Sequence, residues 1–140
     1  MTAARWEHFE HPADIGLRGR GATPAEAFEQ AALALTAVMT DPAAVREALS
    51  VDIHCSATDL ESLLVDWLNA LLYEMAVRRV LFSGFDVRIA GTDLRAIARG
   101  EPMDPGRHGP AVEVKAATYH ALKVEQQADG SWLAQCVVDV

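Results

Sequence analysis

The fold of this chain is decided by the stretch TDLESLLVDWLNALLYEM, residues 58–75. Its first four residues have the pattern of a capping box, in which Thr58 caps a helix and Glu61 reaches back to the capping amide. Apolar residues then recur at spacings of three and four, which places them on one wide helical face. They are Leu60, Leu63, Leu64, Trp67, Leu68, Leu71, Leu72 and Met75. The stretch predicts a long core helix that ends near Arg78, where positive charge suits the negative end of the helix dipole.

A second helix is predicted upstream by the same kind of start signal. Thr23 can cap it, Pro24 suits the first helical position, and Glu26 can reach back to the cap. An apolar stripe follows until Asp41 and Pro42 end the helix. The stripe consists of Phe28, Ala31, Ala32, Leu35 and Met39.

Most of the remaining chain has the pattern of β-strands, with apolar runs bounded by turn residues. Tight turns are predicted at residues 91–93 and at Asp129-Gly130. The predicted strands are 6–10, 15–20, 49–56, 80–89, 94–100, 112–124 and 132–140. We therefore expect an α+β fold, a two-layer sandwich in which a largely antiparallel sheet is covered on one face by two main helices.

The length of 140 residues and the hydrophobic fraction of 51% predict a single domain over residues 1–140. Charges interrupt every apolar run before it reaches the roughly 20 residues that a membrane span needs, so we expect a soluble protein with no membrane contact. The first residues lack the apolar core of a secretory signal, which predicts a cytoplasmic location.

The formal net charge of -8 argues against nucleic acid as a direct partner. The twelve basic residues are scattered apart from the pair Arg78-Arg79, so no basic stripe is available to neutralise a run of phosphates. We expect no DNA binding and only indirect contact with RNA. The acidic surface either complements a basic protein partner or simply keeps the protein soluble.

Two carboxylates stand out as candidate metal ligands. Asp139 lies beside the terminal carboxylate of Val140, and Asp14 would complete an all-oxygen site for a hard divalent cation if the fold brought it close. An aspartate that ends a strand is, however, most often simply exposed. His8, His11 and Asp14 are spaced three apart, but the run is predicted to be extended, so zinc is not predicted.

Two further regions could carry function. Residues 101–110 contain three prolines and two glycines and are predicted to form a loop, which is either a functional surface or a flexible connector. Strand alternation over 113–124 puts Val114 and Ala116 toward the core and Lys115 on the other face. Lys115 could neutralise a carboxylate cluster or reach an anionic ligand, or it could be a solvated lysine. No phosphate loop or nucleophile elbow supports a self-contained enzyme.

Several of these segments, taken in order, resemble the archease family over essentially the whole chain. The resemblance rests on residues 11–16, on residues 59–69 in the long helix, on Gly100, Glu101, Asp104 and His108 in the loop, on residues 113–120, and on Asp139-Val140. It implies a protein cofactor, not an enzyme, whose partner is the GTP-dependent tRNA-splicing RNA ligase that joins 3′-phosphate or 2′,3′-cyclic-phosphate ends to 5′-hydroxyl ends. Such a cofactor promotes guanylylation of the ligase histidine, permits multiple turnovers in tRNA splicing and RNA repair, and broadens the choice of nucleotide.

The resemblance also implies roles for individual residues. Asp14, Asp139 and the terminal Val140 correspond to the ligands of a divalent cation (calcium, magnesium or manganese), and Lys115 corresponds to a lysine needed for activation. Pro12 departs from the family pattern, in which threonine is usual, so a polar contact from that side chain is not expected. The residues expected to face the partner or to support the metal ligands are His11, Glu101, Asp104 and His108.

Two other functions remain open at this point. A metal-dependent hydrolase would use Asp14 and Asp139 with His11 or His108 as its base. A chaperone-like scaffold acting on RNA-processing factors would expose an apolar patch and would tolerate loss of Asp139.

Overall fold

The computed structural model describes residues 4–12, 14–109 and 112–140. Ala13, inside the segment 11–16, and Pro110, at the end of the predicted loop, lie outside these ranges. The elements are β1 (Arg5–His11), β2 (Asp14–Gly21), α1 (Pro24–Met39), the 3₁₀ helix η1 (Pro42–Ala44), β3 (Leu49–Ser56), α2 (Leu60–Arg78), β4 (Val80–Ala90), β5 (Asp93–Pro102), α3 (Pro105–His108), β6 (Ala116–Ala117), β7 (Lys123–Gln126) and β8 (Trp132–Asp139).

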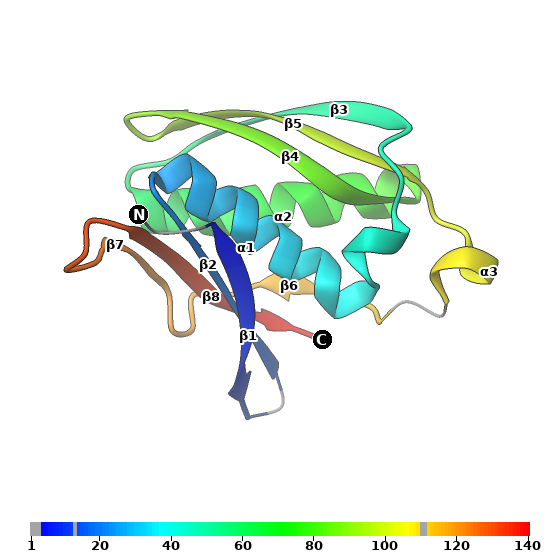
Figure 1. The fold of residues 1–140 in the computed structure, drawn as a ribbon, viewed down its shortest axis with the longest axis horizontal. Helices are drawn as coiled ribbons and strands as arrows, with labels where there is room; N and C mark the ends of the chain where they lie inside the picture. The colour runs from blue at the N-terminus through cyan, green and yellow to red at the C-terminus, as the bar shows by residue number, and fades with distance from the viewer. Residues whose placement is uncertain (1–3, 13, 110–111) are drawn as a thin grey trace.

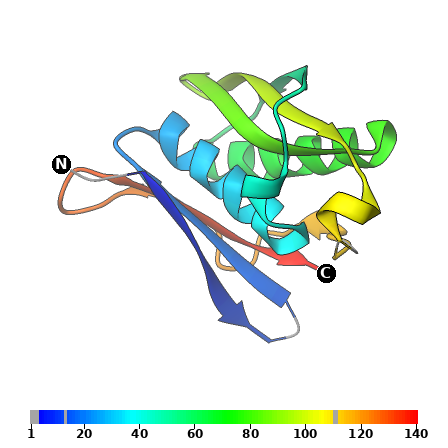
Figure 2. The same ribbon diagram turned by 45° about the vertical axis from the view of Figure 1, so that its right-hand side comes forward.

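The strands form two antiparallel sheets with the two long helices between them (Figures 1 and 2). One sheet has the order β1-β2-β8-β6, with β7 also paired to β8, and the other has the order β3-β5-β4. Helix α1 contacts β2 on one side and β4 on the other, and α2 contacts both β3 and β6. The predicted α+β sandwich with antiparallel strands and two main helices is confirmed. Because the strands divide between two sheets, each helix is covered on two sides.

Both long helices start at the predicted signals. The Thr23 hydroxyl accepts a hydrogen bond from the Glu26 N–H at 3.1 Å, and the Glu26 carboxylate accepts one from the Ala22 N–H at 3.0 Å. In α2 the capping side chain is Asp59, which accepts from the Ser62 N–H at 2.7 Å, so the cap lies one residue later than predicted. The two caps satisfy N–H groups that the first helical turns leave unpaired.

Close backbone contact ties the first sheet to α1. A Cβ atom added at Gly19 would lie 2.3 Å from the Ala27 carbonyl oxygen and 2.4 Å from the Ala31 nitrogen, so only glycine lets β2 approach the helix this closely. The two helices are joined in turn by the buried Trp67, whose indole N–H donates to the Phe28 carbonyl at 3.1 Å. The core thus lies on both sides of the helix layer. No helix in the described ranges is long and apolar enough to cross a membrane.

The predicted strand over residues 112–124 is wrong over most of its length. Only β6 and β7 form, and both pair with the same side of β8. Ala117 pairs with Val138, and Lys123 pairs with Gln135. The five residues 118–122 between β6 and β7 therefore lie opposite only two residues of β8, 136 and 137. This bulge has three extra residues, and an odd number reverses which face the flanking side chains occupy. Ala117 is therefore the buried residue of β6, where the alternation had predicted Ala116.

Candidate functional site

The fold brings Asp14 and Asp139 to facing positions on adjacent strands. Ile15 of β2 pairs with Val138 of β8, and one step further along the same antiparallel ladder places Asp14 opposite Asp139. Directly opposed residues project from the same face, with Cβ atoms typically about 4.5–5.5 Å apart. Two carboxylates from opposite ends of the sequence thus share one face of the sheet. We refer to Asp14 and Asp139 as the carboxylate pair.

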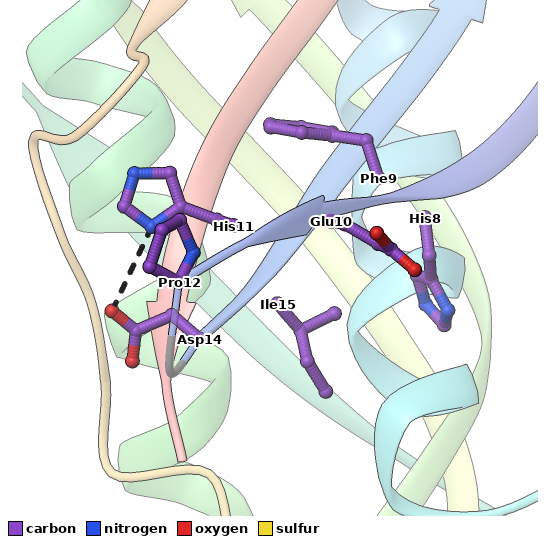
Figure 3. A pocket seen from close by; sticks show the side chains of 7 residues that line it. All are labelled: His8, Phe9, Glu10, His11, Pro12, Asp14 and Ile15. Atoms are coloured by element: carbon purple, nitrogen blue, oxygen red, sulfur yellow. Dashed lines mark ion pairs between the residues drawn. The ribbon is translucent and has the colours of Figure 1, made fainter.

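His11 lies on the same face, next to Asp14. The two residues pair across the β1–β2 hairpin, and His11 Nδ1 lies 4.0 Å from Asp14 Oδ2. Figure 3 shows both side chains on one side of the hairpin beside the end of β8, while His8 and Ile15 point to the other side, toward α1. The Asp14 side chain is 23% exposed, so it is open to a ligand from solvent.

The hairpin end also borders a hollow of about 740 Å³. Because neighbouring residues of a strand point to opposite faces, the hollow extends around both sides of the hairpin, and only part of its lining faces the carboxylate pair. The lining residues are His8, Phe9, Glu10, His11, Pro12, Asp14 and Ile15.

The bulge between β6 and β7 lies along β8 and approaches His11, on the sheet face that carries the carboxylate pair. The Thr118 N–H and hydroxyl both donate to the Val137 carbonyl, at 2.9 and 2.8 Å, and the Val137 N–H donates to the His120 carbonyl at 3.2 Å. The His120 ring lies 5.9 Å from the His11 ring, measured between centroids. The His120 side chain is exposed in this bulge, next to His11.

Lys115 is held at the same end of the sheet by its backbone. Its N–H donates to the Asp139 carbonyl at 2.8 Å, and the residue is exposed. The Asn69 side chain of α2 fixes the next residues, because its Oδ1 accepts from the Ala117 N–H at 2.8 Å and its Nδ2 donates to the Ala117 carbonyl at 3.5 Å. The strand that follows Lys115 is thus secured between α2 and β8.

Asn69 was missed as a site residue by sequence reasoning. The available signal is a polar amide within the apolar helix stretch, between Leu68 and Ala70. A partly buried amide needs hydrogen-bond partners, and here they come from β6, 48 residues away along the chain.

The remaining predicted residues lie in a separate cluster. Glu101 is buried and accepts hydrogen bonds from the Arg107 guanidinium and the Arg46 N–H, and these bonds, that of Arg107 first, lower the pKa of Glu101 to about 2. His108 is also buried, and its Nδ1 accepts from the Asp104 N–H at 2.9 Å while its Nε2 lies 3.5 Å from Glu101 Oε2. Within the described ranges no hydrogen bond or ion pair joins this cluster to the carboxylate pair. The buried side chains of Glu101 and His108 fix the loop, whereas Asp104 and Arg107 are exposed.

The carboxylate pair offers the oxygen donors that a hard cation prefers, but too few of them to hold it alone. Two carboxylates share a face, and the oxygens of Val140 directly follow Asp139, so every candidate donor is oxygen. In the part of the chain that the structure describes, no group of three or more histidine, cysteine, aspartate or glutamate side chains is arranged to hold a metal ion. A cation bound here would therefore need oxygens beyond the two side chains, from Val140, water or a partner.

Comparisons with known proteins agree over nearly the full length. The sequence matches the model of the Archease protein family (MTH1598/TM1083) over residues 6–140. It is 46% identical to protein archease from Pyrococcus furiosus, covering 97% of this chain and 99% of that protein, and 40% identical to protein archease from Methanosarcina acetivorans, covering 97% and 96%.

Solved structures give the same picture. The solution structure of Methanobacterium thermoautotrophicum protein 1598 matches with a TM-score of 0.84 and 36% identity, covering 96% of this chain and 98% of that one. The crystal structure of an archease, possible chaperone, from Thermotoga maritima matches with a TM-score of 0.64 over 94% of each chain. At 22% identity this second likeness concerns the fold alone. The chain belongs to the archease protein family.

Proposed function

We propose that this protein is a non-enzymatic activator of a GTP-dependent tRNA-splicing RNA ligase. It promotes guanylylation of the ligase histidine, allows multiple turnovers and broadens the nucleotides that the ligase accepts. Membership of the archease family supports the choice of partner. The observation that supports the site is the β2–β8 ladder, whose last pair, Ile15 with Val138, adjoins Asp14 and Asp139, together with the backbone bond from the Lys115 N–H to the Asp139 carbonyl.

The carboxylate pair and Val140 would hold a divalent cation, with calcium, magnesium and manganese all compatible with oxygen donors. Such a cation, when bound, supplies positive charge that can stabilise phosphate oxygens. Lys115 is exposed next to Asp139, so its ammonium group can balance the carboxylates or contact a phosphate of the ligase-bound nucleotide. RNA is contacted only through the ligase, since the net charge of -8 opposes direct binding.

A chaperone-like scaffold is the second candidate. The Thermotoga maritima relative carries the description possible chaperone, and several large apolar side chains are exposed on this chain. Suppression of aggregation of unrelated unfolded proteins, undiminished by loss of Asp139, would support that function. An activator instead depends on Asp139 and acts on one ligase.

The test is multiple-turnover RNA joining by the cognate ligase, with the activator carrying an untagged C-terminus. Wild type is compared with Asp14→Ala, Lys115→Ala and Asp139→Ala, and with Asp52→Ala as a matched exposed aspartate on the other sheet. The proposal predicts that wild type and Asp52→Ala stimulate joining and that the three site variants, folded, do not. If wild type gives no stimulation, the proposed function is wrong. If the isolated protein itself hydrolyses GTP or phosphorylated RNA ends, the hydrolase alternative gains support.

A further inference from the structure

The outer side of the second sheet carries charged side chains. Buried residues of β5, among them Leu94 and Ala96, face the helices, so the alternate residues Arg95 and Ile97 project to the other side. Figures 1 and 2 show β3, β5 and β4 over one side of the helix layer, and no helix or strand of the described ranges lies beyond them. Residues of all three strands line a hollow of about 480 Å³ there. We call this side of β3, β5 and β4 the outer face.

The register of the three strands sets two rows of opposite charge side by side in the middle of the outer face. Directly opposed residues project from the same face, so each row runs across all three strands. The basic row, from β3 to β4, is His54, Arg95 and Arg88. The acidic row, in the same order, is Asp52, Ile97 and Asp86.

A single charge of opposite sign flanks each of these rows. Asp93 of β5 lies next to the basic row, and Arg99 of β5 lies next to the acidic row. Their neighbours across the strands are small, with Ser56 and Ala90 beside Asp93 and Ser50 and Gly84 beside Arg99. The four successive rows are therefore negative, positive, negative and positive. Reversing this order exchanges every sign, so the outer face is complementary in charge to a reversed copy of itself.

Part of this charge has no partner within the chain. Asp93 is paired, because His54 Nε2 lies 2.7 Å from its Oδ1 and Arg95 Nε lies 3.7 Å from its Oδ2. Arg88 and Arg95 are directly opposed, an arrangement of like charges that is unfavourable. Four charged side chains of the outer face have no hydrogen bond or ion pair within the described ranges, namely Asp52, Asp86, Arg88 and Arg99.

A second copy of the outer face supplies the missing partners. Two copies can stack about a two-fold axis that lies between them, across the strands and midway between the basic row and the acidic row. This axis reverses the order of the rows, so the basic row of each copy lies over the acidic row of the other. Each contact occurs twice, because a two-fold interface is isologous. The pairs of opposite charge are Arg88 with Asp86, His54 with Asp52, and Arg99 with Asp93.

Charge also excludes the other simple arrangement. A two-fold axis along β5 would exchange β3 with β4 and leave each row in place. His54 would then lie over Arg88, and Asp52 would lie over Asp86, with like charges facing each other. Stacked sheets with nearly aligned strands are about 10 Å apart, a distance that arginine side chains can span. The hollow on the outer face leaves room for them.

We propose that the outer face binds a second copy of this chain, in a two-fold dimer that pairs the basic row of each copy with the acidic row of the other. Three strands are together about 14 Å wide, and eight residues extend about 27 Å, so the dimer buries less than the roughly 1,600 Å² of a standard interface. Association is therefore weak and decreases as salt is added. The carboxylate pair lies on the first sheet, beyond the helix layer, and stays open in both copies. The inference thus goes beyond the proposed function and does not depend on it.

The experiment measures the mass of the full-length protein by sedimentation equilibrium, at low salt and in about 1 M salt, where the Debye length is about 3 Å. The variants are Arg88→Glu and Asp86→Arg, each alone and in an equimolar mixture. Arg5→Glu and Glu125→Arg are matched controls, because they reverse exposed charges on the first sheet. Circular dichroism and thermal melting establish that each variant is folded.

Wild type and both controls are expected to dimerise at low salt and to associate at least tenfold more weakly in about 1 M salt. Alone, Arg88→Glu and Asp86→Arg each set like charges against each other, so each should associate at least tenfold more weakly than wild type at low salt. In the mixture each variant offers the charge that the other lacks, so association should return to the wild-type level. Stimulation of the ligase by either variant is expected to equal that of wild type.

Several results would overturn the dimer. Wild type that stays monomeric at the highest concentration reached would do so, as would equal weakening by the two controls. A mixture that associates no better than the separate variants would refute the pairing of Arg88 with Asp86. Weaker ligase binding by both variants, with monomeric wild type, would assign the outer face to the ligase instead of a second copy. In each of these cases stimulation of the ligase by wild type preserves the proposed function.

Discussion

Replacing Asn69 with alanine removes the side chain that connects α2 to β6. Its bond from the Ala117 N–H has a full-strength length of 2.8 Å, whereas the return bond at 3.5 Å is near the limit of hydrogen bonding. Ala117 is 7% exposed, so its N–H would lose its partner in a largely buried place. An orphaned buried amide costs about 1–3 kcal/mol. A loss of about 2 kcal/mol lowers the unfolding temperature of a domain of this size by roughly 5–10 °C.

The assay is urea and thermal unfolding of Asn69→Ala beside Asp66→Ala, an exposed position one turn earlier on the same helix. The control is expected to change the unfolding free energy by less than about 0.5 kcal/mol. Under conditions in which Asn69→Ala is still folded, ligase stimulation should also fall, because Lys115 lies directly before β6. If Asn69→Ala is no less stable than Asp66→Ala, the bridge does not hold β6. If stability falls and stimulation does not, the position of β6 does not control Lys115.

Three further outcomes are expected. The hydrogen bond from Arg107 is the main reason that the pKa of the Glu101 carboxyl is lowered from 4.5 to about 2. The ionised carboxylate therefore stabilises the fold fully above about pH 4.5, and this contribution is lost as the pH falls toward 2. Glu101→Gln should flatten the acid-unfolding curve between pH 4.5 and 2, and an unchanged curve would contradict the stabilising role of Glu101. Gly19→Ala should lose at least about 1–3 kcal/mol in chemical unfolding, because the new Cβ meets the backbone of α1, whereas Gly106→Ala meets only the end of a side chain at 3.3 Å and should lose far less. Asp14→Asn should abolish any rise in unfolding temperature that calcium gives the chelator-treated wild type, and a rise of equal size in the variant would remove Asp14 from the cation site.

The helices and most strands could be predicted because their signals are local. The caps at Thr23 and near Asp59 are contained within four residues of sequence, and each apolar stripe repeats within a turn. Strand β3 forms over the predicted 49–56, and the turns at Gly91 and Gly130 have the positive φ that glycine favours. Division of the strands between two sheets was not predicted, because alternation shows that a strand has a buried face but not which sheet it joins.

The site could be predicted only as a list of residues. Strand ends are locally visible, but the approach of Asp14 to Asp139 depends on a ladder, ending at Ile15 and Val138, between strands at opposite ends of the chain. Lys115 was expected in the middle of a strand, but it precedes the two-residue strand β6. A continuous ladder does not form there, because a bulge follows Ala117 and the Asn69 side chain bonds the backbone of Ala117. No local pattern encodes either of these tertiary partners. Burial of Glu101 likewise follows from bonds to a distant segment.

Transfer of GMP from labelled GTP to the cognate ligase, measured in a single turnover, tests the central claim most directly. Wild type is expected to accelerate formation of the guanylylated ligase, and Asp139→Ala and Lys115→Ala, each folded and at saturating concentration, are expected to leave the rate at that of the ligase alone. Equal acceleration by wild type and both variants would contradict the assignment of the carboxylate pair and Lys115 as the activating site. No acceleration by wild type would contradict the activator function itself.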